Sequence, residues 1–300
     1  MNKNFENILI YGLGLMGGSL ALAIKNKKFS SKVSAIVRTL ERKKEAESYN
    51  IAEKIYLEDE FLASNLWDEF DFIVLALPID LTCQKIDLIP ENYSGFITDL
   101  GSSKTAIINK VESKYPKSHN YYSSHPMTGS EHSGLKYGKE DLYDNKLCIL
   151  TPASRVSAEA AERVSSFWAQ IGSQIITINA VDHDEILSLV SHSPHILSSL
   201  LAEWIGQNEK VIQYTKNSPL PLTGGGFRDM SRIAGSNPDM WDAIINTNRE
   251  FIYSGLITFR DKLTELIEHL NPNNGCTKGF WKEYFKESKS HRDKILKMNE

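Results

Sequence analysis

The fold of this chain is decided by residues 8–27, which read ILIYGLGLMGGSLALAIKNK. The first four residues of this stretch predict a buried strand, and residues 19–27 have the composition of a helix. Between them, Gly12, Gly14 and Gly17 form the pattern GxGxxG, which brings backbone N–H groups at a helix start close to the phosphates of a dinucleotide. Glycines also serve ordinary turns, but a position inside a β-α-β pattern favours a dinucleotide-binding loop.

Short apolar runs alternate with helical stretches through the first 179 residues. Further strands are expected at residues 33–37, 72–77, 96–100, 121–124, 147–151 and 174–178, and helices at residues 40–49 and 158–171. This alternation predicts a Rossmann-type, doubly wound parallel sheet with helices on both faces.

Beyond Asn179 no further strand is expected. Helical periodicity covers residues 182–207, 239–269 and 278–298. We therefore expect an NADP-binding α/β domain over residues 1–179 and an all-α substrate and dimerisation domain over residues 180–300. The apolar helical faces of this second domain predict a homodimer, because part of its core would form between subunits.

The composition argues against several classes of function. Lys and Arg number 34 against 38 Asp and Glu, and the net charge of −4 leaves no basic stripe for nucleic acid or an anionic membrane. Three cysteines are too few for a disulfide framework or a metal site and indicate a reducing compartment. No signal peptide precedes the first strand, and no stretch of about 18 apolar residues exists. We expect a cytoplasmic chain without nucleic-acid or membrane partners.

The end of the second strand predicts which dinucleotide binds. An NAD enzyme places an acid there, about 20 residues past the glycines, to bond the ribose 2′-hydroxyl. This chain instead has Val37 followed by Arg38 and Thr39, with Arg42 one helical turn further on. A guanidinium group holds a 2′-phosphate and no carboxylate repels it, so NADP is favoured. The alternative is that Arg38 stacks on the adenine, which leaves NAD usable.

Loops at the carboxyl ends of the predicted strands carry the candidate chemistry. Leu77 and Pro78 would line the nicotinamide side of the cleft. His125 follows a strand, where a neutral imidazole can accept a proton from a substrate hydroxyl. Ser102, on the neighbouring loop, would orient that hydroxyl or the imidazole. The alternative for His125 is a structural histidine that bonds a backbone carbonyl.

In the helical half, His192 and His195 lie three residues apart and share a helix face. Pro194 would kink that helix and free a carbonyl near Val190. No carboxylate lies at a matching spacing on this helix, so we expect no metal site. A structural role for one of the two histidines stays open.

Arginines form a second polar motif in the helical half. Arg228 and Arg232 share a helix face, with Asp229 between them. An arginine in a cleft suits bidentate capture of a substrate carboxylate. The alternative is a surface ion pair with Asp229, more so for Arg228 than for Arg232.

Taken in this order, the motifs resemble those of the prephenate/arogenate (cyclohexadienyl) dehydrogenase family. The resemblance covers most of the chain, and its HPxxGxExSG and GGGFxDxxRIA segments are far more specific than the glycine loop. The matching segments are GLGLMGGS at 12–19, DLGS at 99–102, HPMTGSEHSG at 125–134, HD at 183–184, SHSPH at 191–195 and GGGFRDMSRIA at 224–234.

The resemblance implies an enzyme of tyrosine biosynthesis that oxidatively decarboxylates prephenate or arogenate, with hydride transfer to NAD(P)+. It implies that His125 is the catalytic acceptor for the ring hydroxyl, that Ser102 positions it, and that Arg232 binds a substrate carboxylate. The other implied pocket residues are His183, His195, Asp229 and Glu131, the last of which would help to gate the pocket. The residues expected to contact the cofactor are Gly12, Leu13, Gly14, Leu15, Met16, Gly17, Arg38, Thr39, Leu77 and Pro78.

Two other functions share parts of this pattern. A β-hydroxyacid dehydrogenase has the same architecture but uses a lysine on the first long helix of its second domain, where this chain has no lysine before Lys210. A non-catalytic NADP-sensing module would keep the glycine loop and bind NADPH without turnover. The combination of His125, Ser102 and Arg232 favours the dehydrogenase.

Overall fold

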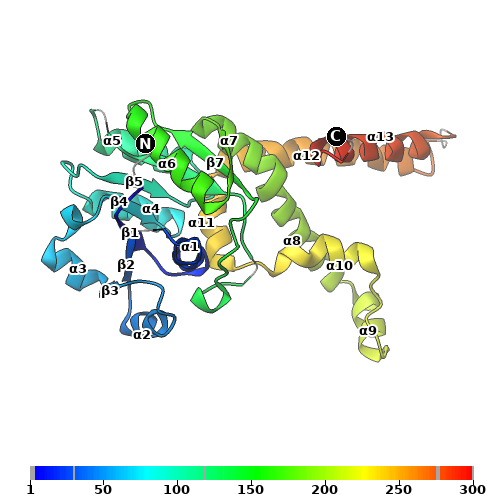
Figure 1. Cartoon of the computed structure of the whole chain (residues 1–300). Coiled ribbons are helices and arrows are strands. Elements are labelled where there is room, and N and C mark those ends of the chain that lie inside the picture. The colour runs from blue at the N-terminus through cyan, green and yellow to red at the C-terminus, as the bar shows by residue number, and fades with distance from the viewer. Residues whose placement is uncertain (1–3, 30, 118, 131, 275–277, 299–300) are drawn as a thin grey trace. The chain divides into compact units, whose positions relative to one another are not determined.

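The computed structural model describes residues 4–29, 31–117, 119–130, 132–274 and 278–298. Its centre is a five-stranded parallel sheet with the strand order β3-β2-β1-β4-β5 (Figure 1). The chain order changes direction between β1 and β4, and nucleotides bind beside such a switch point, at the carboxyl ends of the strands. The strands are β1 (Asn7–Tyr11), β2 (Lys32–Val37), β3 (Lys54–Leu57), β4 (Phe72–Leu75) and β5 (Phe96–Asp99).

Strand β1 is apolar along its length because both faces of the sheet are covered. Ile8, Leu9 and Ile10 are fully buried, and Ile10 pairs with Ala35 on one side and Val74 on the other. A strand buried on both faces has a continuous apolar run rather than an alternating one. The predicted parallel sheet with helices on both faces is therefore confirmed for these five strands.

The remaining strands form a separate three-stranded sheet with the order β6-β7-β8. Strand β6 (Tyr122–Pro126) runs antiparallel to β7 (Leu147–Pro152), whereas β7 is parallel to β8 (Gln174–Thr177). An entirely parallel sheet was expected, and the difference has a simple cause. Only a crossover such as the helix between β7 and β8 returns the chain in the same direction, and no such helix joins β6 to β7.

Two groups of helices cover the opposite faces of the sheet. One apolar cluster includes α1 and α6, and the other includes α4 and α5. The strand β3 and the helices α3, α4 and α5 were not predicted from the sequence. The helices of this half are α1 (Leu15–Asn26), α2 (Leu40–Ser48), α3 (Glu58–Ser64), α4 (Ile79–Leu88), α5 (Thr105–Lys114) and α6 (Ala158–Ile171).

The second half of the chain is helical, as expected. A π-helical turn, Ser188–His192, connects the first two helices without interrupting them. The helices are α7 (Ala180–Leu187), α8 (Ser193–Gly206), α9 (Glu209–Asn217), α10 (Gly225–Ser231), α11 (Pro238–Thr247), α12 (Arg249–Leu270) and α13 (Phe280–Ile295). Within the described residues, no helix is both long and apolar enough to cross a membrane.

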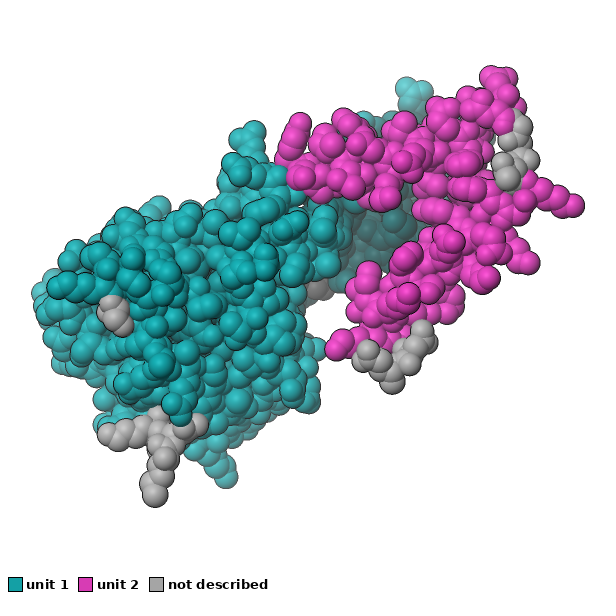
Figure 2. Space-filling model, turned by 90° about the horizontal axis from the view of Figure 1, so that it is seen from above, with its two compact units in different colours: residues 1–252 teal, residues 253–300 magenta. Residues whose placement is uncertain are grey.

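The chain forms two compact units, residues 1–252 and residues 253–300 (Figure 2). The first unit holds both sheets together with the helices that lead to Ile252. The second unit consists of most of α12 and of α13, with His269 stacked on Phe280 at a ring-centroid distance of 3.7 Å. The predicted boundary at residue 179 marks the change from α/β to all-α chain and stays a prediction of domain organisation.

Candidate active site

The glycine loop has the backbone geometry that its sequence predicts. Gly12 has a φ of 102°, and a Cβ atom there would lie 2.6 Å from the carbonyl oxygen of Ala76. A Cβ on Gly17 would lie 2.0 Å from the carbonyl oxygen of Gly12, so only glycine allows helix α1 to approach β1 this closely. A Cβ on Gly14, in contrast, would meet no atom within 4 Å. The surface above Gly14 is therefore open to a ligand.

The first turn of α1 is suited to an anion. Gly14 is the N-cap, no side chain caps the helix, and its first turn carries no acidic residue. Backbone N–H groups at such a helix start bind phosphate. Leu13, which is buried, and Leu15 and Met16, which are half-buried, supply this backbone. The residues present thus fit the pyrophosphate of a dinucleotide.

The segment that follows His125 packs against this same turn. The hydroxyl of Tyr143 donates to the backbone oxygen of Met16 at 2.7 Å, and the N–H of Lys139 donates to Oγ of Ser19 at 3.0 Å. Leu135 lies against Gly18, where a Cβ would come within 2.3 Å of its Cδ1. The phosphate-binding turn and the loop after β6 are therefore one packed structure.

The residues after β2 and β4 lie at the carboxyl edge of the sheet, where the sequence places them. Arg38 is exposed and pairs with no acidic group of the described chain. Thr39 caps α2, since its Oγ1 accepts the N–H of Arg42 at 3.3 Å. Leu77 and Pro78 follow β4 and are half-buried and exposed, respectively.

His125 is the penultimate residue of strand β6 and is connected to two residues of α7. Its Nδ1 lies 2.8 Å from Nε2 of His183, and Nδ1 of His183 lies 2.8 Å from Oδ1 of Asp184. The carboxylate of Asp184 also accepts the backbone N–H groups of Lys104 at 2.7 Å and Thr105 at 2.8 Å. Asp184 thereby occupies the amino end of α5, where a negative charge is favoured.

This chain of contacts fixes the tautomers of both histidines. Burial alone would raise the pKa of Asp184, but its hydrogen bonds from His183, Thr105 and Lys104 outweigh burial and lower that pKa, so the group is an anion that only accepts. His183 must then carry its proton at Nδ1 and accept at Nε2. His125 in turn donates from Nδ1, which leaves the lone pair of its Nε2 as an acceptor.

The charge state of His125 supports the same role. Burial lowers the pKa of His125 well below its usual value, and His183, Lys104 and His192 act in the same direction. The residue is 8% exposed, and with its pKa lowered the ring is neutral at physiological pH. A neutral imidazole with a free Nε2 is a proton acceptor.

A buried ion pair holds the loop between β5 and α5. Nζ of Lys104 donates to Oδ2 of Asp99 at 2.6 Å and to the backbone oxygen of Ser124 at 2.7 Å, and both charged side chains are fully buried. Oδ1 of Asp99 accepts the hydroxyl of Tyr121 at 3.1 Å. Because Ser124 precedes His125, this ion pair ties the predicted serine loop to the strand that carries the imidazole.

Ser102 lies in this loop and is half-buried. Its hydroxyl hydrogen-bonds to no described residue, His125 included. The neighbouring Ser103 is occupied instead, with its Oγ 2.9 Å from Oγ1 of Thr247. Ser102 is therefore available to a ligand, and its role stays a prediction.

His195 lies in the first turn of α8 and is half-buried. Its Nδ1 is 2.9 Å from the backbone oxygen of Ser191, and its ring stacks on Trp241 at 3.9 Å. Since a carbonyl only accepts, His195 carries a proton at Nδ1 and directs Nε2 elsewhere. Burial lowers its pKa, and the charge of Arg232 acts in the same direction. Arg232 begins a 3₁₀ turn, Arg232–Gly235, that packs against α8.

The arginine motif lies on exposed chain. Arg228, Asp229 and Arg232 are all exposed, and none forms an ion pair with a described residue. The alternative interpretation, a surface pair between Asp229 and an arginine, is thus not seen in the structure. Glu131, the implied gating residue, lies outside the described residues.

Three further polar residues belong to the hydrogen-bonded network around His183. They are Asp184, the buried His192 and Asn248, which is 3% exposed and bonds both of the others. From the sequence, Asn248 had no expected role, Asp184 had no expected site role and His192 had only an open structural role. His183 was expected to line the substrate pocket, but it is fully buried behind His125 with both ring nitrogens engaged. Among the described residues, no cluster of histidine, cysteine and acidic groups is suited to a metal ion.

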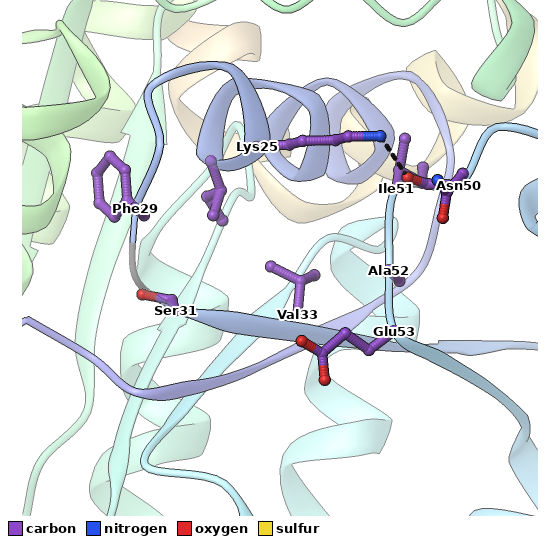
Figure 3. A pocket seen from close by; sticks show the side chains of 9 residues that line it. Lys25, Phe29, Ser31, Val33, Asn50, Ile51, Ala52 and Glu53 are labelled. Atoms are coloured by element: carbon purple, nitrogen blue, oxygen red, sulfur yellow. Dashed lines mark hydrogen bonds between the residues drawn. The ribbon is translucent and has the colours of Figure 1, made fainter.

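A hollow of about 280 Å³ lies at the opposite edge of the sheet (Figure 3). It is lined by the end of α1, the start of β2 and residues 50–53, and Lys25 donates across it to the backbone oxygen of Asn50. These are the amino ends of the strands. The hollow therefore contains none of the candidate site residues.

Comparison with known proteins agrees with this geometry. The prephenate dehydrogenase nucleotide-binding domain matches residues 20–177, and the dimerization domain of the same family matches residues 179–287. Prephenate dehydrogenase of Bacillus subtilis is 29% identical over 98% of this chain and 77% of its own length. Cyclohexadienyl dehydrogenase of Zymomonas mobilis is 30% identical over 96% of this chain and 95% of its own length.

Solved structures show the same relationship. The crystal structure of prephenate dehydrogenase from A. aeolicus, in complex with hydroxyphenyl propionate and NAD+, superposes with a TM-score of 0.83 at 27% identity. The alignment covers 98% of this chain and 100% of that one. With both domains of the family matched, the chain belongs to the prephenate dehydrogenase family.

Proposed function

We propose that this chain is a dehydrogenase that converts prephenate or arogenate to 4-hydroxyphenylpyruvate or tyrosine, with release of CO₂. The observation that carries the proposal is the hydrogen-bonded series from Asp184 through His183 to His125. It presents one neutral, acceptor-only imidazole nitrogen near the carboxyl end of β6, in the same compact unit as the dinucleotide loop. A non-catalytic binding module has no need of an imidazole held in this state.

The glycine loop and the first turn of α1 would hold the dinucleotide. When it is bound, the nicotinamide supplies the acceptor for the hydride. The chain's own residues position the substrate and control one proton. Gly12, Gly14 and Gly17 allow the backbone to approach the pyrophosphate, and Leu77 and Pro78 would border the nicotinamide.

His125 would accept the proton of the substrate's ring hydroxyl through Nε2. As the carbinol carbon is oxidised, the forming dienone withdraws electrons from the carbon that bears the ring carboxylate. The bond to that carboxylate breaks, CO₂ departs, and the ring becomes aromatic. Formation of the aromatic ring makes the overall reaction irreversible. His125 contributes because it is positioned at the hydroxyl and neutral, so that it can accept the proton.

A carboxylate group of the substrate requires a cationic partner on the protein. Arg232 is exposed, close to His195 and without an acidic partner in the described chain, so its guanidinium is free to bind a carboxylate. We propose Arg232 and His195 as the substrate-binding pair, with Asp229 as a further pocket residue and Ser102 beside the hydroxyl. The gating role of Glu131 stays a prediction from the resemblance. His183 acts through His125 and is a positioning residue in this scheme.

We propose NADP as the preferred cofactor. The A. aeolicus relative was crystallised with NAD+, so the family does not require NADP. The support lies in Arg38, which is exposed, has no acidic partner in the described chain and follows β2 at the position of the ribose. A guanidinium at this position favours a 2′-phosphate.

We also propose a homodimer formed through the helical half. Large apolar side chains on its helices are exposed, with Trp204 69% exposed. Many large apolar side chains left exposed on helices favour an interface that covers them. In the first unit, the exposed apolar side chains of this half are Val181, Ile186, Leu189, Val190, Leu200 and Trp204, among others. Sedimentation of the purified chain should give twice the monomer mass, and a monomer would refute the dimer.

The activity is tested by following reduced nicotinamide with the purified chain. Prephenate and arogenate are each paired with NADP and with NAD, which gives four assays. Turnover in any pair supports the dehydrogenase, and the fastest pair identifies substrate and cofactor. A folded chain that binds NADPH but turns over neither acid would refute the enzyme and favour the binding module.

A further inference from the structure

Asn248 follows α11 and hydrogen-bonds two groups at once. Its Nδ2 lies 2.8 Å from the backbone oxygen of Asp184 and 2.9 Å from Nδ1 of His192. A carbonyl oxygen only accepts, so the atom that faces Asp184 is the amide nitrogen. That nitrogen's second hydrogen points to His192, whose Nδ1 must accept it. Neutral His192 therefore carries its proton at Nε2.

The Nε2–H group of His192 has no hydrogen-bond partner among the described residues. The residue is only 1% exposed, and its Nε2 forms no hydrogen bond with any residue that the structure describes. Trp241 meets the ring nearly edge-on, with the centroids 5.9 Å apart and the planes at 78°, and offers no acceptor. An oxygen atom of a ligand could therefore accept a hydrogen bond from this N–H group.

The ring of His192 is neutral, so the Nε2–H group is a donor without a charge. Burial is the main cause that lowers the pKa of His192 to about 4. The charged and titratable groups that face it are Asp184, which opposes this shift, and His183 and His195, which reinforce it.

His192 and His125 are anchored to the same residue. The side chain of Asp184 holds His183 and, through it, His125, while its backbone oxygen holds Asn248 and, through it, His192. The two series end in opposite states. His125 presents an acceptor at Nε2, and His192 presents a donor at Nε2.

We propose that Asn248 is a positioning residue that fixes His192 as a hydrogen-bond donor, and that His192 binds the substrate oxygen whose proton passes to His125. The proposal rests on the proposed function. A hydroxyl group donates one hydrogen bond and accepts others, so one acceptor and one donor together match it. The oxygen remains an acceptor as its proton leaves and the C=O bond forms, and a fixed donor stabilises the negative charge that develops on it.

The tautomers can be observed directly by long-range ¹H–¹⁵N NMR of the histidine rings, without any substrate. In the full-length chain, His192 should carry its proton at Nε2 and His125 at Nδ1. Asn248→Asp replaces the donor by an acceptor and should move the proton of His192 to Nδ1. A proton that stays at Nε2 in this variant would overturn the role of Asn248.

Kinetics separate positioning from a structural contribution. Asn248→Asp should lower kcat about 10- to 100-fold and change KM less than about 3-fold, because the donor acts mainly in the transition state. The matched control is Thr247→Val, which removes the neighbouring bond to Ser103 and does not touch His192. It should leave both the tautomer and kcat unchanged. Equal losses in the two variants would refute the proposal.

Substitution of the histidine itself tests the donor if Asn248→Asp does not fold. His192→Gln keeps an N–H group near Nε2 and should lose less than about 10-fold in kcat, whereas His192→Leu should lose about 10²- to 10³-fold. Equal losses would contradict the donor role. An Nε2–H at His192 without turnover of either acid would contradict the proposed function, whereas turnover with His192 protonated at Nδ1 would contradict this inference.

Discussion

His125 and His183 come from segments 58 residues apart in the sequence, yet their rings share one hydrogen bond of 2.8 Å between Nδ1 and Nε2. The direction of that bond is set by Asp184, which accepts from the other nitrogen of His183. The imidazole at the edge of the site therefore owes its acceptor state to a carboxylate that never meets the substrate. This relationship leads to the first prediction.

Asp184→Asn should reverse the direction of the hydrogen bonds that run from residue 184 through His183 to His125. An amide can donate to Nδ1 of His183, which moves the proton of each ring to the other nitrogen and turns Nε2 of His125 into a donor. We expect kcat to fall by about 10²- to 10⁴-fold, as expected for a histidine held in the wrong tautomer. Asp182→Asn, two residues earlier on the same helix and exposed, is the control. A kcat within a few-fold of wild type in Asp184→Asn would remove the series from the mechanism.

Stability should depend on pH because neutral histidines are buried. His192 has a pKa lowered to about 4, whereas a histidine in the unfolded chain titrates near 6.5. Below about pH 6.5 the unfolded state binds a proton that the folded state does not. The free energy of unfolding therefore decreases as the pH is lowered. For His192 alone the loss reaches about 3 kcal/mol at about pH 4, and the pKa values of His125 and His183 are lowered in the same sense.

Urea denaturation between about pH 7.5 and about pH 5 measures this slope. His192→Gln should flatten it, and His291→Gln, at an exposed position of α13, should not. A free energy of unfolding that stays constant over the range would show that these histidines are charged in the folded protein.

Arg232→Ala should act on substrate binding. Loss of a charge-assisted pair with a carboxylate costs about 1.5–3 kcal/mol, which corresponds to a rise in KM of about 10- to 100-fold with kcat little changed. Arg228→Ala, also exposed and in the same motif, is the matched control and should leave KM unchanged. If kcat falls while KM holds, Arg232 acts in the transition state instead.

Arg38→Asp should change the cofactor. A carboxylate after β2 repels the 2′-phosphate of NADP and can bond the ribose hydroxyl of NAD. The ratio of kcat/KM for NADP over NAD should fall by about 100-fold or more, which corresponds to about 2.7 kcal/mol. Lys44→Asp makes the same change of charge at an exposed position of α2 and should leave the ratio as it is. An unchanged ratio in Arg38→Asp would mean that the guanidinium does not meet the phosphate.

Much of the fold follows from local patterns. The glycine loop, the strand at residues 8–11 and the change to helices after Asn179 each have a period or a turn signal within a short window. Strand β3 and helices α3, α4 and α5 do not. These elements are short and have weak intrinsic preference, so packing on the sheet stabilises them. The antiparallel β6–β7 pair depends on the absence of a crossover helix, which the strand residues themselves do not reveal.

The site also contains residues that a local motif predicts and contacts that no local motif predicts. His125, Arg38 and Arg232 are recognisable because each follows a specific motif. The connections of His125 to Asp184 and of His192 to Asn248 join residues 56 to 59 positions apart, and no local pattern predicts them. Pro194 was expected to kink its helix, and the structure shows a π-helical turn immediately before α8 instead. Such turns are often found at functional sites.

The most direct test of the account is the turnover of His125→Asn at saturating substrate. His119→Asn, which changes the other histidine that is 8% exposed, is the control. Loss of the acceptor should lower kcat by about 10²- to 10⁴-fold with little change in the dissociation constant of the substrate, and the control should keep wild-type turnover. Unchanged turnover in His125→Asn would contradict the assignment of the proton acceptor and, with it, the proposed mechanism.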